Sequence, residues 1–345
     1  MPKKKKISGN VTILIPTYNR HRQLKRLLDY YSNCAFPILV ADSTTASFPF
    51  VKNYRNVKYF HYPNYPYAKK LPLIYKHVKT EYVLFCADDD FVIPDAIQKC
   101  LNFLEDNPDY SSAHGHYVFF ENRNKENISV YPFYLASVDL DINSNRPSER
   151  VTQLLSSYMQ LLYAVTKTSD IKQVFNYLAE YPEIKNDNLV EIFQAIILCI
   201  NGKSKTLPIF YCAREKTPNS ASTYTDDLDV ICCKAKYTKQ YRVWLDVIAK
   251  HLAKKERIPQ TEAKEKILLA VNLYLANSFM YIPFLRISFL SIQRAVNKYS
   301  LGFAKKVYNL ILPPSGKNNL KKHAFSRKDS IREFDKIQSY IYQSY

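Results

Sequence analysis

The sequence predicts an α/β fold, with a doubly wound sheet followed by a helical C-terminal extension. In the first quarter of the chain, short apolar runs alternate with helical patterns, which is typical of a parallel sheet. Each apolar run ends abruptly in polar residues, so these polar groups are expected at one edge of the sheet. From about residue 226 onward, only helical patterns are evident.

The first 95 residues supply the strands that define this sheet. Each apolar run is short and β-prone, which is typical of strands that are buried on both faces. Between the first two runs, Leu24, Leu27 and Leu28 are spaced so that they share one face of a helix. We expect strands at Val11–Ile15, Pro37–Ala41, Val57–Phe60 and Tyr82–Ala87, with helices at 24–31 and Leu71–Val78.

Residues 96 to 225 continue with mixed elements. His114 and His116 are two residues apart and would point to the same side of a strand, so they could bind a metal, although strand histidines are more often only hydrogen-bonded. A polar loop is expected at Asn122–Asn127. We expect strands at Tyr117–Phe120, Leu161–Val165 and Leu207–Tyr211, and helices at Pro147–Met159, Ile171–Ala179 and from the Asn186-Asp187 cap to Asn201-Gly202.

Composition narrows the classes of function. The chain of 345 residues has only 5 Gly and contains neither GxGxxG nor GxxxxGK[ST], which disfavours a Rossmann dehydrogenase and a P-loop kinase. The net charge of +18 favours polyanionic partners, namely nucleic acid, acidic membranes or phosphorylated substrates. The 7 Cys form no CxxC and most lie in apolar runs, which indicates reduced thiols in a cytosolic protein.

No targeting segment is predicted. The basic residues Pro2–Lys6 precede an apolar run that is short and interrupted by Asn19 and Arg20, unlike a signal peptide. No run reaches the roughly 18 apolar residues of a membrane-spanning helix. We therefore expect a cytoplasmic protein.

Three consecutive aspartates, Asp88–Asp90, follow the predicted strand at Tyr82–Ala87. Carboxylates this close repel one another unless a cation lies between them. Because ligands of open α/β sheets bind outside the carboxyl ends of the strands, a divalent metal that carries a phosphorylated substrate would suit this position. An acidic loop or a helix cap is the alternative.

Three segments read VTILIPTYNR, ILVADST and KTEYVLFCADDDFVIP. Together they resemble the nucleotide-binding half of family 2 glycosyltransferases with the GT-A fold, and the resemblance covers roughly residues 10 to 216. It implies a nucleotide-diphospho-sugar transferase. In that family the first strand end and an Asp after the second strand hold the uracil and ribose, and the acidic motif holds Mg²⁺ or Mn²⁺ that bridges the diphosphate.

The resemblance also implies particular site residues. Lys70 or its neighbour Lys69 falls where the family often has an Arg near the phosphates. Ala87 falls where the family has the first Asp of D-x-D, so which aspartates hold the metal or the ribose stays open. The implied donor-binding residues are Pro16, Thr17, Tyr18, Asn19, Arg20, Asp42, Lys70, Asp88 and Asp89, and the implied metal ligands are Asp88, Asp89 and Asp90.

The helix that follows Asn186 resembles the family segment in which a carboxylate acts as the catalytic base. Counting back from Gly202 places Glu191 at the family's catalytic Asp, with Val190-Glu191 in place of the usual Glu-Asp pair. Asp187 is the alternative base, and a solvated helix Glu is the plain structural interpretation of Glu191. A base on the face of the sugar opposite the leaving group implies inversion at the anomeric carbon.

The C-terminal region is strongly basic. Between Arg286 and Lys336 there are twelve Lys/Arg and three Asp/Glu. Such a basic amphipathic helix could lie on an anionic membrane, or it could pack its apolar face on the domain. The pattern consists of Phe303, Val307, Leu310 and Ile311 interleaved with Lys298, Lys305 and Lys306.

These inferences predict a metal-dependent, inverting glycosyltransferase with a GT-A domain at 1–225 and a mainly helical region at 226–345. The nucleotide-binding half is 10–95 and the acceptor half is 96–225. The expected donor is a nucleoside-diphosphate sugar, first of all a UDP-sugar. The expected cofactor is Mn²⁺ or Mg²⁺, and the acceptor is a glycan or lipid-linked hydroxyl, as in a cell-surface polysaccharide.

Two other functions fit part of the pattern. A nucleotidyltransferase shares the sheet and the acidic site, but it usually needs a Gly- and Arg/Lys-rich first loop, which Pro16–Arg20 is not. A nucleic-acid-binding protein is suggested by the charge and the 29 Tyr, acting through the basic C-terminal helices. The acidic triplet argues against a polyanion at the crevice, so no nucleic acid is expected there.

Overall fold

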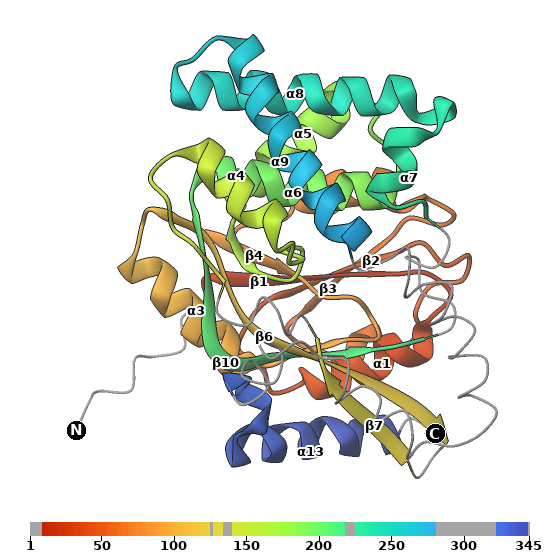
Figure 1. The fold of residues 1–345 in the computed structure, drawn as a ribbon. Helices are drawn as coiled ribbons and strands as arrows, with labels where there is room; N and C mark the ends of the chain where they lie inside the picture. Colours follow the sequence, from red (N-terminus) through yellow and green to blue (C-terminus); the bar gives the residue numbers. More distant parts are fainter. Residues whose placement is uncertain (1–8, 125–126, 134–139, 218–224, 281–321, 344–345) are drawn as a thin grey trace, which may run out of the picture.

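The computed structural model describes residues 9–124, 127–133, 140–217, 225–280 and 322–343, and these form a central sheet between two helical layers (Figure 1). The helices α4, α5, α6, α8 and α9 cover one face of the sheet, and α1, α3 and α13 cover the other. The predicted α/β class with a sheet and a helical extension is confirmed.

The sheet contains ten strands. They are β1 (Val11–Thr17), β2 (Ile38–Asp42), β3 (Val57–His61), β4 (Tyr82–Phe85), β5 (Phe91–Val92), β6 (Tyr110–Asn124), β7 (Asn127–Pro132), β8 (Asp141–Ile142), β9 (Val165–Lys167) and β10 (Lys203–Glu215).

The described helices, with three short 3₁₀ turns, fill the two outer layers. They are α1 (His21–Tyr30), α2 (Tyr67–Tyr75), α3 (Pro94–Asp106), α4 (Pro147–Ser156), α5 (Thr168–Glu180), α6 (Asp187–Asn201), α7 (Leu228–Cys233), α8 (Thr238–Glu256), α9 (Gln260–Met280) and α13 (Lys328–Gln343), with turns η1 (Val51–Asn53), η4 (Ala235–Tyr237) and η5 (Ala324–Ser326).

The sheet is parallel in its first half and mixed in its second. Its main order is β3-β2-β1-β4-β9-β6-β10-β5, with β7 beside β6 and β8 beside β10. The pairs β1/β2, β2/β3 and β1/β4 are parallel, as predicted. However, β9 runs antiparallel to both β4 and β6, so the doubly wound pattern does not extend through the acceptor half.

Three predicted elements differ from the structure. Within the polar loop expected at Asn122–Asn127, residues 122–124 belong to β6 and Asn127 belongs to β7, with which β6 pairs antiparallel. The strand expected at Leu161–Val165 starts only at Val165, since a turn closed by Ala164 N–H and Leu161 C=O precedes it. Helix α2 starts four residues earlier than expected, since Lys70 N–H bonds to Pro66 C=O and closes its first turn.

The register of the parallel strands places their polar ends side by side. Thr17, at the end of β1, pairs with Asp42, at the end of β2, and β4 runs alongside β1 toward the same edge. The turn after β1 includes Asn19, whose φ of 54° is left-handed and whose N–H bonds to Thr44 Oγ1 at 2.8 Å. Asparagine is among the few residues that adopt this conformation readily.

The C-terminal helices pack onto both faces of the sheet. Trp244 and Ile248 of α8 are fully buried in the core formed with α4 and α6, and Ile337 and Ile341 of α13 are buried in the core on the opposite face. The apolar face of α13 therefore lies on the protein. The predicted domain boundary at 225 stays a prediction.

Two further predictions concern the membrane. None of the described helices is both long and apolar enough to span a bilayer. The basic amphipathic pattern that includes Phe303, Val307, Lys298 and Lys305 lies outside the described residues.

Candidate active site

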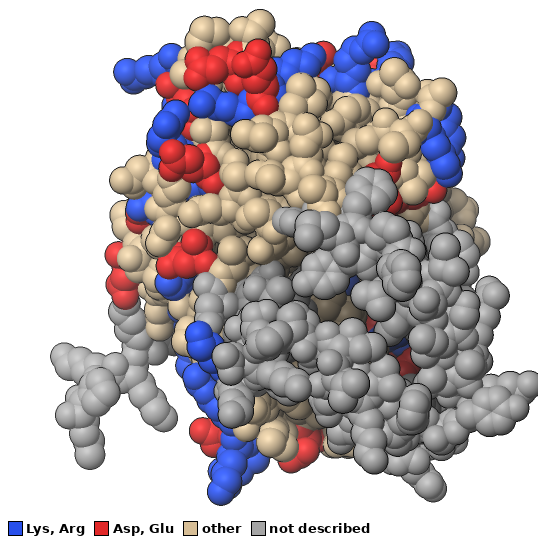
Figure 2. All heavy atoms as spheres, viewed as in Figure 1, with Lys and Arg blue, Asp and Glu red and all other residues tan. Residues whose placement is uncertain are grey.

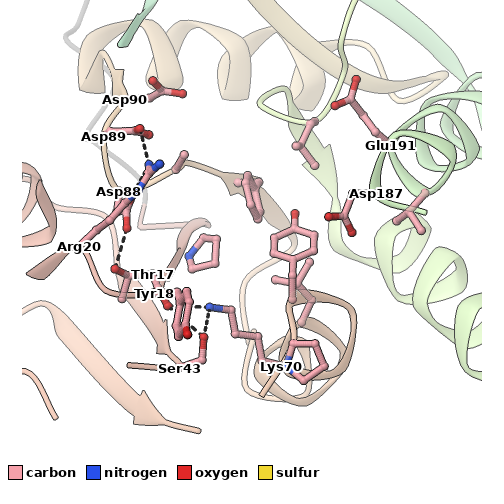
Figure 3. A pocket seen from close by; sticks show the side chains of 18 of the residues that line it. Thr17, Tyr18, Arg20, Ser43, Lys70, Asp88, Asp89, Asp90, Asp187 and Glu191 are labelled. Atoms are coloured by element: carbon pink, nitrogen blue, oxygen red, sulfur yellow. Dashed lines mark hydrogen bonds and ion pairs between the residues drawn. The ribbon is translucent and has the colours of Figure 1, made fainter. Parts of the chain in front are cut away.

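The predicted site residues, apart from Asp42, line one cavity of about 770 Å³ at the carboxyl edge of β1 and β4. Figure 3 shows the acidic motif and Arg20 on one side of the cavity and Asp187 and Glu191 on the other. The wall opposite Asp88 and Asp89 is formed by α6, and the segment between α4 and β9 connects the two sides through Tyr163 at Asp90 and Gln160 at Glu191. The cavity is therefore bordered by carboxylates from two separate parts of the fold.

Asp88 and Asp89 lie on the first wall and share one cation. The carboxylate of Asp88 accepts from Thr17 Oγ1 at 2.6 Å, and Arg20 Nη1 lies 3.4 Å from its other oxygen. The same Arg20 nitrogen lies 2.5 Å from Asp89 Oδ2. A single guanidinium thus stands between two carboxylates.

Asp90 points away from this pair toward β10 (Figure 3). Its Oδ2 accepts from Tyr163 and from Arg214 Nε at 3.3 Å, and its Oδ1 accepts the backbone N–H of Glu215 at 2.8 Å. Both oxygens are therefore engaged by donors of the protein. The structure separates Asp90 from the other two carboxylates, and the three do not form one cluster.

The electrostatic state of the motif reflects crowding and burial. Burial, with the neighbouring Asp89, raises the pKa of Asp88. Burial and Asp89 likewise raise the pKa of Asp90, although Arg214 opposes the shift. Burial and mutual repulsion therefore disfavour the charged forms of these carboxyl groups, and an additional cation between them would relieve the repulsion.

Lys70 reaches the cavity from α2. Its ammonium group is buried and donates to Thr17 C=O at 2.7 Å and to Ser43 Oγ at 2.9 Å. Burial lowers the pKa of Lys70 to about 8. The early start of α2 brings Lys70, and not Lys69, to the cavity wall.

Asp42 is not among the residues that line the cavity, and its predicted contact with the nucleotide stays a prediction. Its side chain is 0% exposed, and it accepts from Tyr59 OH at 2.7 Å and from Thr44 N–H at 2.7 Å. Its Oδ2 also lies 2.6 Å from His21 Nε2. Burial opposes the charged form, but these hydrogen bonds prevail and lower the pKa of Asp42. The neighbouring Ser43 lines the cavity in its place.

Glu191 lies on the inner face of α6. Asn186 caps this helix by accepting Leu189 N–H at 3.0 Å, which sets the helix start one turn before Glu191. The Glu191 carboxylate accepts from Tyr158 OH at 3.0 Å and from Gln160 Nε2. Burial raises the pKa of Glu191, against these two hydrogen bonds.

Asp187, the alternative base, lies in the first turn of α6 and also lines the cavity (Figure 3). Partial desolvation raises the pKa of its carboxyl group. As a residue Asp187 is exposed, whereas Glu191 is half-buried and held by two donors. Glu191 is therefore the better-positioned of the two carboxylates.

Sequence reasoning did not identify Tyr158, Gln160 and Tyr163 as site residues. They lie in an irregular segment between α4 and β9, which the sequence suggested would be the end of a helix and a strand. No sequence pattern marks them: Gln160 and Tyr163 line the cavity, and Tyr158 contacts Glu191.

The two histidines considered as metal ligands have structural contacts. His114 Nδ1 lies 2.9 Å from Gly115 O, and burial lowers the pKa of His114 to about 4. His116 Nδ1 accepts Ala324 N–H at 2.8 Å. Within the described ranges, no group of three or more His, Cys, Asp or Glu side chains has a metal-site arrangement.

On the face drawn in Figure 2, the described residues show basic and acidic side chains together, and much of the basic segment 286–336 lies outside the described residues. There, Lys and Arg side chains lie at the upper and lower ends, acidic side chains are mixed among them, and a broad uncharged area lies between. Nucleic-acid binding would favour a continuous basic stripe on one face.

Comparison with protein families matches residues 12–154 to glycosyl transferase family 2. No curated protein matches the chain. Among solved structures, the chain is similar to S. aureus TarS 1–349 in complex with UDP-GlcNAc, with 14% identity over 77% of this chain and 73% of that chain and a TM-score of 0.50. This likeness shows the fold.

Two other solved structures are similar at lower TM-scores. One is S. aureus TarS 1–349, with 12% identity over 79% of this chain and 72% of that chain and a TM-score of 0.49. The other is the mannosyltransferase PcManGT from Pyrobaculum calidifontis in complex with GDP-Man and Mn²⁺, with 16% identity over 97% of this chain and 85% of that chain and a TM-score of 0.42.

Proposed function

We propose that this chain, whose residues 12–154 match glycosyl transferase family 2, moves a sugar, with inversion, from a nucleoside-diphosphate sugar to a hydroxyl acceptor. The main support for this proposal is the way in which the site residues are placed around the cavity. The strand-end residues with the acidic motif and the half-buried Glu191 occupy opposite walls of one cavity (Figure 3). Displacement in line needs such an arrangement, with a leaving-group site on one side and a base on the other.

The donor side suits a diphosphate. Thr17, Ser43 and Lys70 form a polar cluster beside the acidic motif, in which Lys70 is a buried cation. Tyr18 is 54% exposed at the cavity and offers an aromatic face to a nucleotide base. The crystal structure of TarS with UDP-GlcNAc is the reason to test UDP-sugars first.

The residues present fit a divalent metal at Asp88 and Asp89. Hard cations prefer oxygen ligands, and Mg²⁺ is often bound by one or two carboxylates together with substrate phosphates. Asp88 and Asp89 supply those carboxylates, whereas Asp90 is engaged elsewhere. Bound Mn²⁺ or Mg²⁺ would add positive charge next to the leaving diphosphate. The guanidinium of Arg20 lies between the two carboxylates, so it would have to move away when a metal ion binds there or remain beside the metal ion.

On the acceptor side, Glu191 is proposed as the general base. The acceptor oxygen forms a bond to the anomeric carbon while its proton passes to the Glu191 carboxylate. The bond from the anomeric carbon to the diphosphate oxygen breaks, and its electron pair leaves with the nucleoside diphosphate. A positioned base typically contributes about 10²–10⁴-fold in rate.

For the acceptor and the cellular location, we propose what the sequence predicted. We propose a glycan or lipid-linked acceptor, as in polysaccharide synthesis, and a cytoplasmic location. The free cysteines among the described residues support a reducing compartment. Contact with an anionic membrane would depend on the C-terminal region, most of which lies outside the described residues.

A thermal-shift panel of UDP-, GDP-, CMP- and dTDP-sugars, each with and without Mn²⁺, tests the proposal. A ligand at about 100 times its Kd stabilises the folded protein by roughly 2.7 kcal/mol, so the matching donor should raise the Tm clearly and more so with Mn²⁺. Transfer is then assayed with the donor that binds. No response to any sugar nucleotide would contradict the proposed function.

A further inference from the structure

A chain of hydrogen bonds links the third aspartate of the acidic motif to the proposed base, so this inference rests on the proposed function. Arg214 Nε lies 3.3 Å from Asp90 Oδ2, and Arg214 Nη1 donates to Gln160 Oε1. Gln160 Nε2 then donates to Glu191 Oε2. The chain joins residues from the β4–β5 turn, β10, the α4–β9 segment and α6.

The direction of the Gln160 amide follows from the chemistry of its two neighbours. A guanidinium has only donors, so the amide atom that faces Arg214 must be the oxygen. The amide nitrogen consequently faces Glu191, where an ionised carboxylate has only acceptors. A reversed amide would place oxygen against oxygen at Glu191 and a donor against a donor at Arg214. Arg214 therefore fixes which atom Gln160 presents to the base.

Arg214 is itself held firmly. Its guanidinium carbon lies 4.7 Å from the centre of the Tyr163 ring and 5.6 Å from that of Phe133. Tyr163 also donates to Asp90, so the same carboxylate anchors both the cation and one of the rings that cover it. This explains why Asp90 turns away from Asp88 and Asp89.

We propose that Gln160 is a positioning residue for Glu191, with its amide oriented by Arg214, and that Asp90 anchors this arrangement and is not a metal ligand. The hydrogen bond from Gln160 favours the ionised form of Glu191. With Tyr158 on the other oxygen, it holds the carboxylate in one orientation toward the cavity.

Other groups also act on Glu191. Arg214 favours its ionised form and Asp227 disfavours it. Tyr67 interacts electrostatically with both Glu191 and Asp187. Since burial is the largest effect and raises the pKa of Glu191, the two donors limit that rise. Removal of either donor should therefore raise the pKa further.

The main test is Gln160→Met, which keeps a similar length but removes the donor. Two quantities are measured across pH: kcat/KM, and the carbon-13 NMR shift of the Glu191 carboxyl group. The acidic limb of kcat/KM and the NMR titration should both move upward by roughly one pH unit, the size expected for one lost hydrogen bond to a charged group. The affinity for the donor nucleotide should be unchanged. Gln98→Met on α3, away from the cavity, is the matched control and should leave both midpoints in place.

A second variant covers the case in which Gln160→Met does not fold. Gln160→Glu keeps the shape and the contact with Arg214 but places a second carboxylate beside Glu191, so the upward movement should be larger. Unmoved midpoints in both variants would overturn the proposal. The NMR titration tests the role of Gln160 even if no sugar transfer is detected. The proposed function, in contrast, is contradicted by an absence of transfer or by full activity of Glu191→Gln.

The role of Arg214 is tested by a double-mutant cycle with Arg214→Lys, which keeps the charge but not the planar fork. Arg214→Lys alone should raise the NMR midpoint of Glu191, because the amide is no longer oriented. The same change in the Gln160→Met background should have little further effect. An equal shift in both backgrounds would show that Arg214 does not act through Gln160.

Discussion

The two walls of the cavity use carboxylates in opposite ways. Asp88 and Asp89 crowd together around the guanidinium of Arg20, and burial together with this crowding raises the pKa of Asp88. Glu191 accepts from the uncharged Tyr158 and Gln160, and burial raises its pKa. Crowded carboxylates favour the binding of a cation, and an isolated carboxylate with neutral donors favours the exchange of a proton. The difference supports the proposal that the leaving group lies at the first wall and the acceptor at the second.

The largest effect is expected from Glu191→Gln, which removes the base and keeps the shape of the wall. Turnover should fall by about 10²–10⁴-fold, since this is the usual contribution of a positioned base. Donor binding, measured by calorimetry, should be kept. Asp187→Asn is the control, and a greater loss of turnover in that variant would move the base to Asp187.

A smaller effect is expected from Asp89→Asn on the first wall. The change removes one charged oxygen ligand, so metal-dependent donor binding should weaken by at least about tenfold, which corresponds to the roughly 1.5–3 kcal/mol of a charge-assisted contact. Calorimetric titration of the donor with and without Mn²⁺ measures it. Asp95→Asn, in the first turn of α3, is the control. Unchanged metal-dependent affinity in Asp89→Asn would remove this aspartate from the metal site.

The smallest effect concerns Arg20→Met. Because Arg20 stands between Asp88 and Asp89, its removal should make Mn²⁺ bind more tightly in the absence of nucleotide, by about three- to tenfold. Electron paramagnetic resonance of free Mn²⁺ provides the measurement, with Arg22→Met on the exposed side of α1 as the control. Equal or weaker Mn²⁺ binding would mean that the guanidinium and the metal do not compete.

The residues that form the first wall could be predicted from the sequence because the patterns that mark them are local. Strands β1 and β4 are continuous apolar runs, and the polar residues that follow them, Pro16–Arg20 and Asp88–Asp90, line the cavity as expected. Parallel pairing alone brings such strand ends together. The helix that carries Glu191 was also predicted, since a capped apolar helix is a strong pattern, whereas the role of Glu191 rested on the family resemblance.

The contacts within the site could not be predicted in the same way. Asp42 is turned inward by His21 and Tyr59, and neither contact follows from the spacing of these residues in the chain. Asp90 and Arg214 meet only because β5 pairs antiparallel with β10. Such contacts depend on the packing of side chains from distant segments, which the periodicity of a single sequence does not record.

The position of α13 has a consequence for the order in which the protein is built. Tyr340 of α13 contacts Tyr30 of α1 with ring centres 5.5 Å apart, and Phe334 contacts Phe120 of β6 at 6.0 Å. A ribosome releases α1 long before it releases α13, so these aromatic surfaces stay in water until the helix arrives. Contacts between such distant segments also slow folding, because a long loop must close first. The aromatic surface that α13 covers on α1 and β6 is therefore exposed in the nascent chain, where it favours aggregation.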